Sequence, residues 1–354
     1  MGARPQFIKL APLSKILRKK HQEVILHTGQ HYDEEMSSLF FSELNIPKPD
    51  YNLGIGSGNQ GEQTGKMLAK IEEVLLFEKP DLVLVYGDTN TTLAGALASA
   101  KLHIPIGHIE AGLRSYNNKM PEEINRVIAD KLSTLFFCPT KTSVLNLKKE
   151  GIKKGVFLVG DVMYDSLHYY KEIAEKKSKI LTRLKIKEKN FYLITIHRAK
   201  NTDEKNNLKK IVKILSQLDK KTVFPLHPRT KKYLHQYGLW EKFASIPNLV
   251  ITEPLSYLDM LNLEKNAWYV LTDSGGVQKE AFFFKTPCLT LREETEWLET
   301  EKSGLNKIVG LDENKIFKAL KTPVKLSPQF KKIYKITSPG TGEKITRIIS
   351  KEIC

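Results

Sequence analysis

The chain has 354 residues, 41% of them hydrophobic and 27% charged, which allows a sizeable core and predicts two domains. No apolar run reaches the roughly 18 to 20 residues of a membrane-spanning helix, and residues 1–9 are not followed by the apolar stretch of a signal peptide. We therefore expect a cytoplasmic protein that binds no membrane. The formal net charge of +16 comes from scattered lysines without interleaved aromatic residues, which indicates a basic surface and no nucleic-acid partner.

Cysteine and histidine spacing argues against the common metal sites. Cys138, Cys288 and Cys354 lie far apart and form no CxxC pair, which indicates ordinary reduced thiols. No histidine pair has metal-ligand spacing with a third ligand, and no serine nucleophile elbow or paired Cys–His motif is present. We expect neither a metal nor a cofactor.

Short apolar runs alternate with longer amphipathic segments in the first half of the chain, which is typical of a doubly wound α/β domain. Helices are predicted over 63–76 and 121–132. Buried parallel strands are predicted over 24–26, 82–86, 104–106, 136–138 and 156–159.

The same pattern begins again after the charged segment 171–189, with strands predicted over 191–196, 222–226, 249–252, 268–272 and 287–291. We therefore expect two Rossmann-like, doubly wound domains, 1–168 and 169–336, with the ligand in a cleft between the carboxyl ends of their strands. The remaining segment, 337–354, contains a predicted helix over about 342–353 that we expect to dock on the first domain.

The first loop of the chain is unusual. Gly2 to Gln6 look like the loop after the first strand of a doubly wound domain, yet only Met1 precedes them. We expect either a truncated or misassigned start or another segment in the place of that strand.

Three carboxylates follow predicted strands or open predicted helices between 86 and 126. Asp88 lies in the turn after one strand, and Glu110 follows the next. Glu122 and Arg126 are four apart on one helix face, so the acids could gather at one rim beside Arg114 and Arg126. Neighbouring carboxylates push each other's pKa values apart, which provides a proton acceptor and a donor. The alternatives are a helix N-cap for Asp88 and surface salt bridges for the others.

The second domain has a strand, a turn and a helix over 271–280. Ser274, Gly275 and Gly276 allow a phosphate to approach the positive end of that helix, and Glu280 is placed to hold ribose hydroxyls. A tight turn is the alternative. His197 follows the strand 191–196 and is expected to face the cleft, unless it only begins a helix.

Together these motifs resemble the non-hydrolysing UDP-N-acetylglucosamine 2-epimerases, from the segment Gly2–Lys9 through the Gly275–Gly276 pair to about Gly310. The resemblance implies two Rossmann-like domains of the glycosyltransferase GT-B type and a homodimer. It implies that a base removes the C2 proton and UDP leaves C1, which gives a 2-acetamidoglucal. UDP then adds back, and C2 is protonated from the other face, for the synthesis of surface polysaccharide precursors.

The resemblance also implies roles for individual residues. Asp88, Glu110 and Glu122 are the acid–base candidates, and His197 assists at the phosphates or the leaving group. The implied substrate-binding residues are Arg4, Lys9, Arg126, His227, Ser274, Gly275, Gly276, Glu280 and Arg292.

Two departures from the common pattern leave the substrate open. The first loop reads Gly2-Ala3-Arg4-Pro5-Gln6 where Gly-Thr-Arg-Pro-Glu is usual, and Trp297 stands where an arginine is usual. Both resemble the branch that acts on UDP-2,3-diacetamido-2,3-dideoxyglucuronic acid. Bacterial members can also bind an activating UDP-N-acetylglucosamine after a Gln-His pair. Here Tyr32-Asp33 after His31 depart from that pattern, so the sequence does not establish such regulation.

Other classes remain as alternatives. A glycosyltransferase of the same architecture commonly needs only one base, which the series Asp88, Glu110 and Glu122 argues against. A hydrolysing 2-epimerase would release free UDP. A nucleic-acid-binding protein is motivated by the charge alone.

Overall fold

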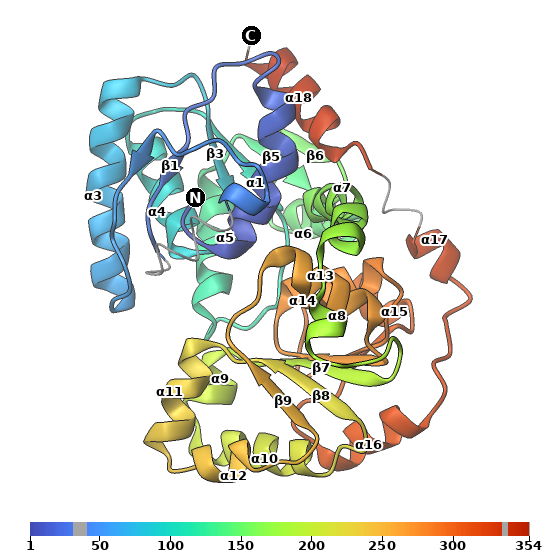
Figure 1. The fold of residues 1–354 in the computed structure, drawn as a ribbon. Coiled ribbons are helices and arrows are strands. Elements are labelled where there is room, and N and C mark those ends of the chain that lie inside the picture. The colour runs from blue at the N-terminus through green and yellow to red at the C-terminus, as the bar shows by residue number, and fades with distance from the viewer. Residues whose placement is uncertain (31–40, 335–338, 354) are drawn as a thin grey trace. The chain divides into compact units, whose positions relative to one another are not determined.

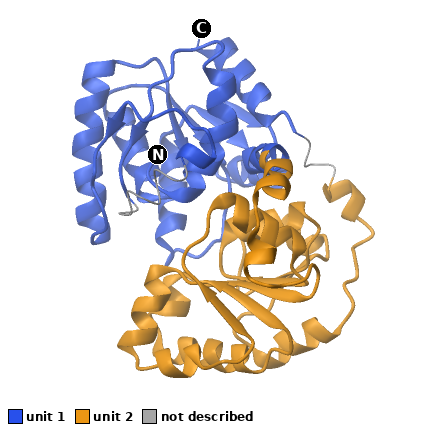
Figure 2. Ribbon diagram, viewed as in Figure 1, with its two compact units in different colours: residues 1–169, 336–354 blue, residues 170–335 orange. Residues whose placement is uncertain are grey.

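The computed structural model describes residues 1–30, 41–334 and 339–353 (Figure 1). His31, Tyr32 and Asp33 lie outside this part of the chain. Two compact units are present, one of residues 1–169 and 336–354 and the other of residues 170–335 (Figure 2). Both units have parallel strands and intervening helices, which confirms the predicted fold class of two Rossmann-like domains. Over the described ranges, no helix is both long and apolar enough to cross a membrane.

The described residues of unit 1 form two parallel sheets, with strand orders β1-β2 and β3-β4-β5-β6. Its strands are β1 (Leu26–His27), β2 (Tyr51–Asn52), β3 (Val83–Tyr86), β4 (Ile106–Ile109), β5 (Leu135–Cys138) and β6 (Val156–Leu158). Its helices are α1 (Arg4–Leu17), α3 (Gln60–Glu78), α4 (Asn90–Lys101), α5 (Pro121–Leu132), α6 (Lys141–Lys149), the first part of α7 (Val162–Lys177) and α18 (Thr341–Glu352).

Local chemistry explains where several of these helices begin. Pro121 occupies the first turn of α5, where its missing N–H costs no hydrogen bond. Thr89 caps α4 by accepting from the backbone N–H of Thr92. At the start of α18, Asp165 of α7 accepts from the backbone N–H groups of Gly340 and Gly342 at 3.0 and 2.8 Å. The carboxylate of α7 thereby holds the start of the last helix.

Helix α18 packs on α1 within unit 1 (Figure 1). Ile345 and Ile349 of α18 are buried, as are Leu13 and Leu17 of α1. Removal of apolar surface from water contributes about 25 cal/mol for each Å². Burial of these side chains therefore stabilises the packing of α18 on α1.

Unit 2 contains one six-stranded parallel sheet with the order β12-β11-β10-β7-β8-β9. Its strands are β7 (Phe191–Thr195), β8 (Lys221–Pro225), β9 (Leu249–Thr252), β10 (Tyr269–Thr272), β11 (Cys288–Thr290) and β12 (Asn306–Ile308). Its helices are α8 (Ile180–Arg183), α9 (Ala199–Thr202), α10 (Lys205–Ser216), α11 (Pro228–Gln236), α12 (Trp240–Ala244), α13 (Tyr257–Asn266), α14 (Gly275–Phe283), α15 (Leu298–Lys302), α16 (Glu313–Lys321) and α17 (Phe330–Tyr334).

The strand order of unit 2 reverses between β7 and β10. From β7 the chain adds β8 and β9 on one side, and it then returns to add β10, β11 and β12 on the other. Ligands of open parallel sheets bind at the carboxyl ends of the strands at such a reversal. The residues that follow β7 and β10 are therefore the candidate ligand-binding residues of this unit.

Most predicted strands are present, but the strand predicted over 104–106 is wrong in position. The observed strand β4 runs from Ile106 to Ile109, so it includes Gly107 and His108. The imidazole ring of His108 is fully buried. The fold tolerates this burial because both ring nitrogens have hydrogen-bonding partners. The short strands β2 and β12 were not predicted.

Candidate active site

The turn after β3 places Asp88 against Arg126. Gly87 has φ +64, a conformation that glycine adopts without strain. Arg126 of α5 is buried and donates from Nη2 to Oδ2 of Asp88. Asn125 of the same helix donates from Nδ2 to the backbone oxygen of Asp88 at 3.0 Å. Two successive side chains of α5 therefore hold this turn and its carboxylate.

Glu110 comes directly after β4 and pairs with Lys9 of α1, and both side chains are 8% exposed. Glu110 adopts φ +75, which is rare for a residue with a side chain and typical of functional sites. A β-carbon on Gly87 would lie 3.0 Å from Nζ of Lys9 and 3.3 Å from Oε2 of Glu110. The ion pair therefore lies against the turn that carries Asp88, which brings three of the sequence-predicted residues together.

A buried network of hydrogen bonds fixes the turn that carries Asp88. His108 contacts the backbone oxygen of Gly87 through Nε2 and Oδ1 of Asp130 through Nδ1, both at 2.8 Å. Asp130 also accepts from Arg114 at 2.7 Å and from the backbone N–H of Gly112 at 3.1 Å. Burial opposes the ionisation of Asp130, but His108 and Arg114 prevail and hold the pKa of its carboxyl below its ordinary value.

The structure assigns Arg114 to this support rather than to the catalytic rim. Its guanidinium makes two hydrogen bonds to the carboxylate of Glu150, each of 2.7 Å, besides its bond to Asp130. A bidentate pair of this kind fixes the relative orientation of the two side chains and also neutralises their charges. The expected position of Arg114 beside the acid cluster is therefore corrected to a link between α5 and the end of α6.

Glu123 is a residue that sequence reasoning missed. Its buried carboxylate pairs with Arg126 at 3.0 Å and accepts from the backbone N–H groups of Ser115 and Tyr116, both at 2.9 Å. The neighbouring acid, Glu122, is half-buried in the first turn of α5. One carboxylate thus ties the loop after β4 to the helix, and the other remains a catalytic candidate.

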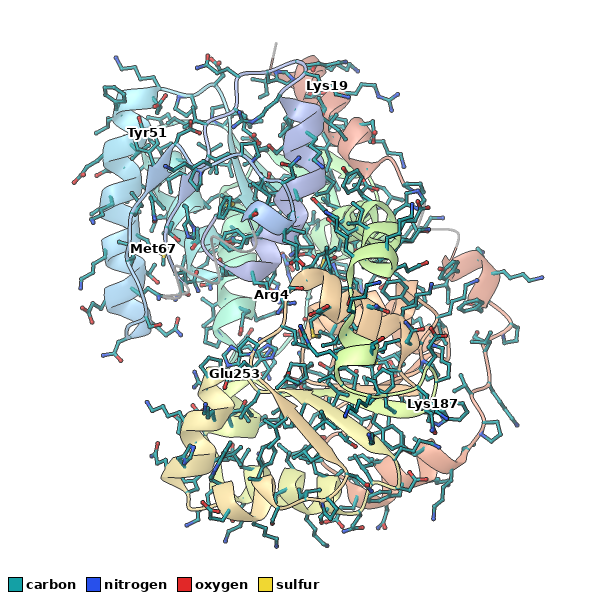
Figure 3. The ribbon with its side chains drawn as sticks, in the orientation of Figure 1. Arg4, Lys19, Tyr51, Met67, Lys187 and Glu253 are labelled. Carbon is teal, nitrogen blue, oxygen red and sulfur yellow. The ribbon has the colours of Figure 1, made fainter. Side chains whose placement is uncertain are left out.

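Arg4 is the first residue of α1 and is half-buried (Figure 3). Lys9 lies on the same helix, and it is buried. Helix α1 therefore carries both of the cationic residues that the sequence predicted for phosphate binding in this unit.

In unit 2, His197 and Asp273 lie at the reversal of the sheet, because they follow β7 and β10. Asp273 is fully buried and accepts from the backbone N–H groups of His197 and Arg198 at 3.1 and 3.0 Å. It also accepts from Nδ2 of Asn201 at 3.0 Å. Burial raises the pKa of Asp273, while these donors act in the opposite direction. The carboxylate thus shapes the loop that presents His197.

His227 lies beside His197, with ring centroids 5.4 Å apart. It is the N-cap of α11, and its Nδ1 accepts from the backbone N–H of Arg229 at 3.1 Å. This hydrogen bond fixes the ring at the end of β8, next to the end of β7 in the sheet. The two predicted histidines are therefore brought together in this unit.

Helix α14 begins directly after Ser274, and Gly275 and Gly276 form its first turn. The backbone N–H of Ser274 donates to Oγ1 of Thr272 at 2.9 Å. A β-carbon on Gly275 would lie 2.6 Å from Oε1 of Glu296, so this glycine is needed for a protein carboxylate that approaches the helix. Sequence reasoning missed Glu296 as a neighbour of this helix start.

Buried charged groups surround the start of α14. Arg292 pairs with Glu296 at 3.0 Å, and both side chains are less than a tenth exposed. Nζ of Lys279 lies 3.9 Å from the ring centroid of Trp297, a cation–π distance. Glu280 is also buried. The predicted binding residues Glu280 and Arg292 thus lie on the interior of unit 2 and not on an open surface.

One Rossmann-like unit has paired carboxylates at the ends of two adjacent strands, and the other has two adjacent histidines and a glycine-containing helix start. This arrangement is that of a two-unit α/β protein with candidate ligand-binding residues in both units. The family model described as UDP-N-acetylglucosamine 2-epimerase matches residues 15–351. The chain belongs to this family, which confirms the resemblance seen in the sequence, and it is an isomerase.

Individual relatives agree with this assignment. A Methanococcus maripaludis protein named UDP-N-acetylglucosamine 2-epimerase homolog is 59% identical over 317 residues, covering 89% of each chain. The UDP-2,3-diacetamido-2,3-dideoxy-D-glucuronate 2-epimerase of Pseudomonas aeruginosa is 47% identical, covering 91% of this chain and 90% of its own. The crystal structure of Methanocaldococcus jannaschii UDP-GlcNAc 2-epimerase in complex with UDP-GlcNAc and UDP is 46% identical, with a TM-score of 0.92 and coverage of 99% and 98%.

Proposed function

We propose that the protein interconverts UDP-N-acetylglucosamine and UDP-N-acetylmannosamine without hydrolysing them. A base removes the proton at C2 as the C1–O bond to UDP breaks, which leaves a 2-acetamidoglucal and free UDP. UDP then adds back to C1, and an acid delivers a proton to the opposite face of C2. The reaction consumes no oxidant, reductant or water.

The observation that carries this proposal is the cluster in unit 1. Asp88 and Glu110 follow adjacent parallel strands, and each is paired with a buried cation, Arg126 and Lys9 respectively. Proton removal from a weakly acidic carbon requires a positioned base, and its return requires a positioned acid. We assign this exchange to Asp88, Glu110 and Glu122, without allotting each to a face of C2. Arg4, Lys9 and Arg126 supply positive charge to the diphosphate.

We assign the binding of UDP to unit 2. The N–H groups at the start of α14, from Ser274 to Gly276, favour an anion because they carry the positive end of the helix dipole. We assign to His197 the stabilisation of the departing diphosphate and to His227 the support of His197. Glu280 is assigned to the ribose, and Arg292 orients Glu296 at the helix start.

Turnover in deuterated water tests the reaction. The C2 hydrogen of both epimers is expected to exchange with solvent, because the intermediate has lost it. NMR of recovered UDP-sugars that shows no deuterium at C2 in either epimer would contradict the proposal. Stoichiometric release of UDP would instead indicate a hydrolysing enzyme, and a requirement for an acceptor would indicate a glycosyltransferase.

The M. jannaschii enzyme, whose structure contains UDP-GlcNAc, supports the choice of UDP-N-acetylglucosamine as substrate. The similarity to the P. aeruginosa enzyme makes UDP-2,3-diacetamido-2,3-dideoxyglucuronic acid the comparison substrate. Both are incubated separately, and the C2 proton is followed by NMR. Faster turnover of the uronate by tenfold or more in kcat/KM would move the assignment to that branch.

The same proposal includes a cytoplasmic homodimer that supplies precursors of surface polysaccharides. The buried free thiols Cys138 and Cys288 suit a reducing compartment. Sedimentation at micromolar concentration tests the dimer.

A further inference from the structure

The carboxylate of Glu110 has little direct access to bulk water. Its side chain is 8% exposed, and so is that of its ion-pair partner, Lys9. Under the proposed function, a bound sugar would cover this carboxylate further. The same function expects the hydrogen at C2 to exchange with solvent, so a proton held by Glu110 must leave the site during the life of the intermediate. A route for that proton through the protein would make this exchange possible.

A small cavity adjoins the Lys9–Glu110 pair at the carboxyl ends of β4, β5 and β6. It offers about 10 Å³ of room for the centre of a water molecule, which is the space that one water needs. Among the described residues, ten line this cavity, and seven of them are apolar or glycine. The three with polar side chains are Lys9, Glu110 and Asp161. A buried water has roughly two to four polar partners, and these three side chains supply them.

Asp161 connects this cavity with the surface of unit 1. It lines the cavity and is half-buried, so part of the residue is open to solvent. Its Oδ1 accepts from the backbone N–H of Met163 at 2.9 Å, which fixes the carboxylate at the start of α7. The preceding residue, Gly160, has φ +102, a conformation that favours glycine. A carboxylate fixed in this way can take a proton from a water in the cavity and release it to bulk water.

We propose that the cavity binds one water molecule that links Glu110 to Asp161, and that Glu110 exchanges its proton with solvent along this path. The inference rests on the proposed function. Glu110, protonated by the removal of the C2 proton, gives that proton to the water, and the water gives one of its own to Asp161. An O–H bond of Glu110 is broken and one of Asp161 is formed, the water is regenerated, and Asp161 then loses the proton to bulk water. When Glu110 serves as the acid, the same path runs in reverse. Asp161 does not touch the sugar and acts only through Glu110, as a positioning residue.

The test follows deuterium at C2 of the starting sugar. Each epimer, deuterated at C2, is incubated separately in ordinary water, and NMR compares the loss of label from unreacted sugar with the conversion to the other epimer. The natural protein is expected to lose label from the starting sugar, because the deuteron leaves Glu110 before it returns to C2. In Asp161→Asn the deuteron is expected to stay on Glu110. The ratio of label loss to conversion should then fall roughly fivefold or more for the epimer whose C2 proton Glu110 removes, and remain unchanged for the other.

Two further variants separate a proton path from a structural effect. Val162 is buried and lines the cavity, and Val162→Ile adds a methylene group that takes the space of the water while Asp161 is kept. This variant is expected to lower the same ratio for the same epimer. Asp312→Asn is the matched control, because Oδ1 of Asp312 accepts from the backbone N–H of Lys315 at 3.0 Å at the start of α16. Both ratios are expected to remain unchanged in it.

Two results with Asp161→Asn would overturn the proposal. One is an unchanged ratio for both epimers, and the other is an equal fall for both, which would reduce Asp161 to a cap of α7. A high-resolution crystal structure tests the water without turnover, and the absence of a water within hydrogen-bonding distance of both Glu110 and Asp161 would also overturn the proposal. Failure of the proposed function itself is distinguished by the natural protein, which would then convert neither epimer.

Discussion

Lys9 and Glu110 form an ion pair whose two side chains are each 8% exposed. The pair joins the first helix of the chain to the residue after β4, 101 positions later. Charges buried to this degree are stable only when they are paired, and removal of one partner leaves the other desolvated. The pair therefore serves the fold, besides placing a carboxylate at the candidate site.

A double-mutant cycle separates these two functions. Lys9→Met and Glu110→Gln are each expected to lower the free energy of unfolding by about 3 kcal/mol, because each leaves a buried charge without its counter-ion. The double variant is expected to regain more than half of that loss. It is nevertheless expected to stay at least ~100-fold less active, because the proposed acid–base group is gone.

Urea unfolding and C2 exchange measure the two quantities. The exposed pair Lys66–Glu62 is the matched control, and Lys66→Met is expected to change stability by less than ~0.5 kcal/mol. Full activity in the double variant would remove Glu110 from the proposed mechanism.

Asp88 and Glu123 both pair with Arg126, but the side chain of Asp88 is 30% exposed and that of Glu123 is 2% exposed. Asp88→Asn is therefore expected to lower kcat by about 100-fold or more with little change in melting temperature. Glu123→Gln is expected to destabilise the protein by roughly 2 kcal/mol, because buried N–H donors of Ser115 and Tyr116 lose a charged acceptor. Calorimetry and single-turnover kinetics check the contrast. Similar stability losses in the two variants would contradict it.

The sequence could predict the fold and the strand ends because these depend on local pattern. Helix α5 has the predicted bounds, since Pro121 marks its first turn and its apolar face repeats at helical spacing. Asp88 and Glu110 could also be predicted from local pattern, because each follows a short apolar run that is typical of a buried strand. Strand β2 was missed because two residues are too short to show alternation.

Residues that act through distant partners could not be found in this way. Glu122 and Glu123 both occur in the first turn of α5, and helical spacing alone cannot say which of them meets the loop at Ser115. Asp273 binds the backbone of His197 across 76 positions, and Glu296 approaches Gly275 from a loop. Only the sheet order brings such residues together, so a local motif does not reveal them.

The carboxyl group of Asp165 is expected to make the stability of the folded protein depend on pH. Burial raises the pKa of this carboxyl to about 6 from an ordinary value of 3.8, against the opposing N–H groups of Gly342 and Gly340. The folded state therefore holds the proton more tightly than the unfolded state. The contribution of Asp165 to stability is present below pH 4 and is lost as the pH rises through about 6.

Asp165→Asn removes this titration. Relative to the variant, the natural protein is expected to lose roughly 2 to 3 kcal/mol of stability between pH 4 and pH 7. Urea unfolding of both proteins at unit intervals of pH measures the difference, in which groups common to both cancel. A difference that is constant over this range would show that the carboxyl does not titrate there.

Asp273 is expected to act on the reaction through His197, because its carboxylate accepts from the backbone of His197 and Arg198 and lies 3.6 Å from Nδ1 of His197. Asp273→Asn turns an N–H₂ group toward one of these donors, which displaces the loop. A fall in kcat of roughly tenfold is expected for this variant.

In a His197→Ala background the same substitution is expected to have almost no further effect on kcat, because the group it positions is absent. Asp203→Asn, which alters a more exposed pair with Arg229 in the same unit, is the matched control and is expected to leave kcat unchanged. If the losses from Asp273→Asn and His197→Ala multiply instead, Asp273 acts independently of His197 and the proposed coupling is wrong.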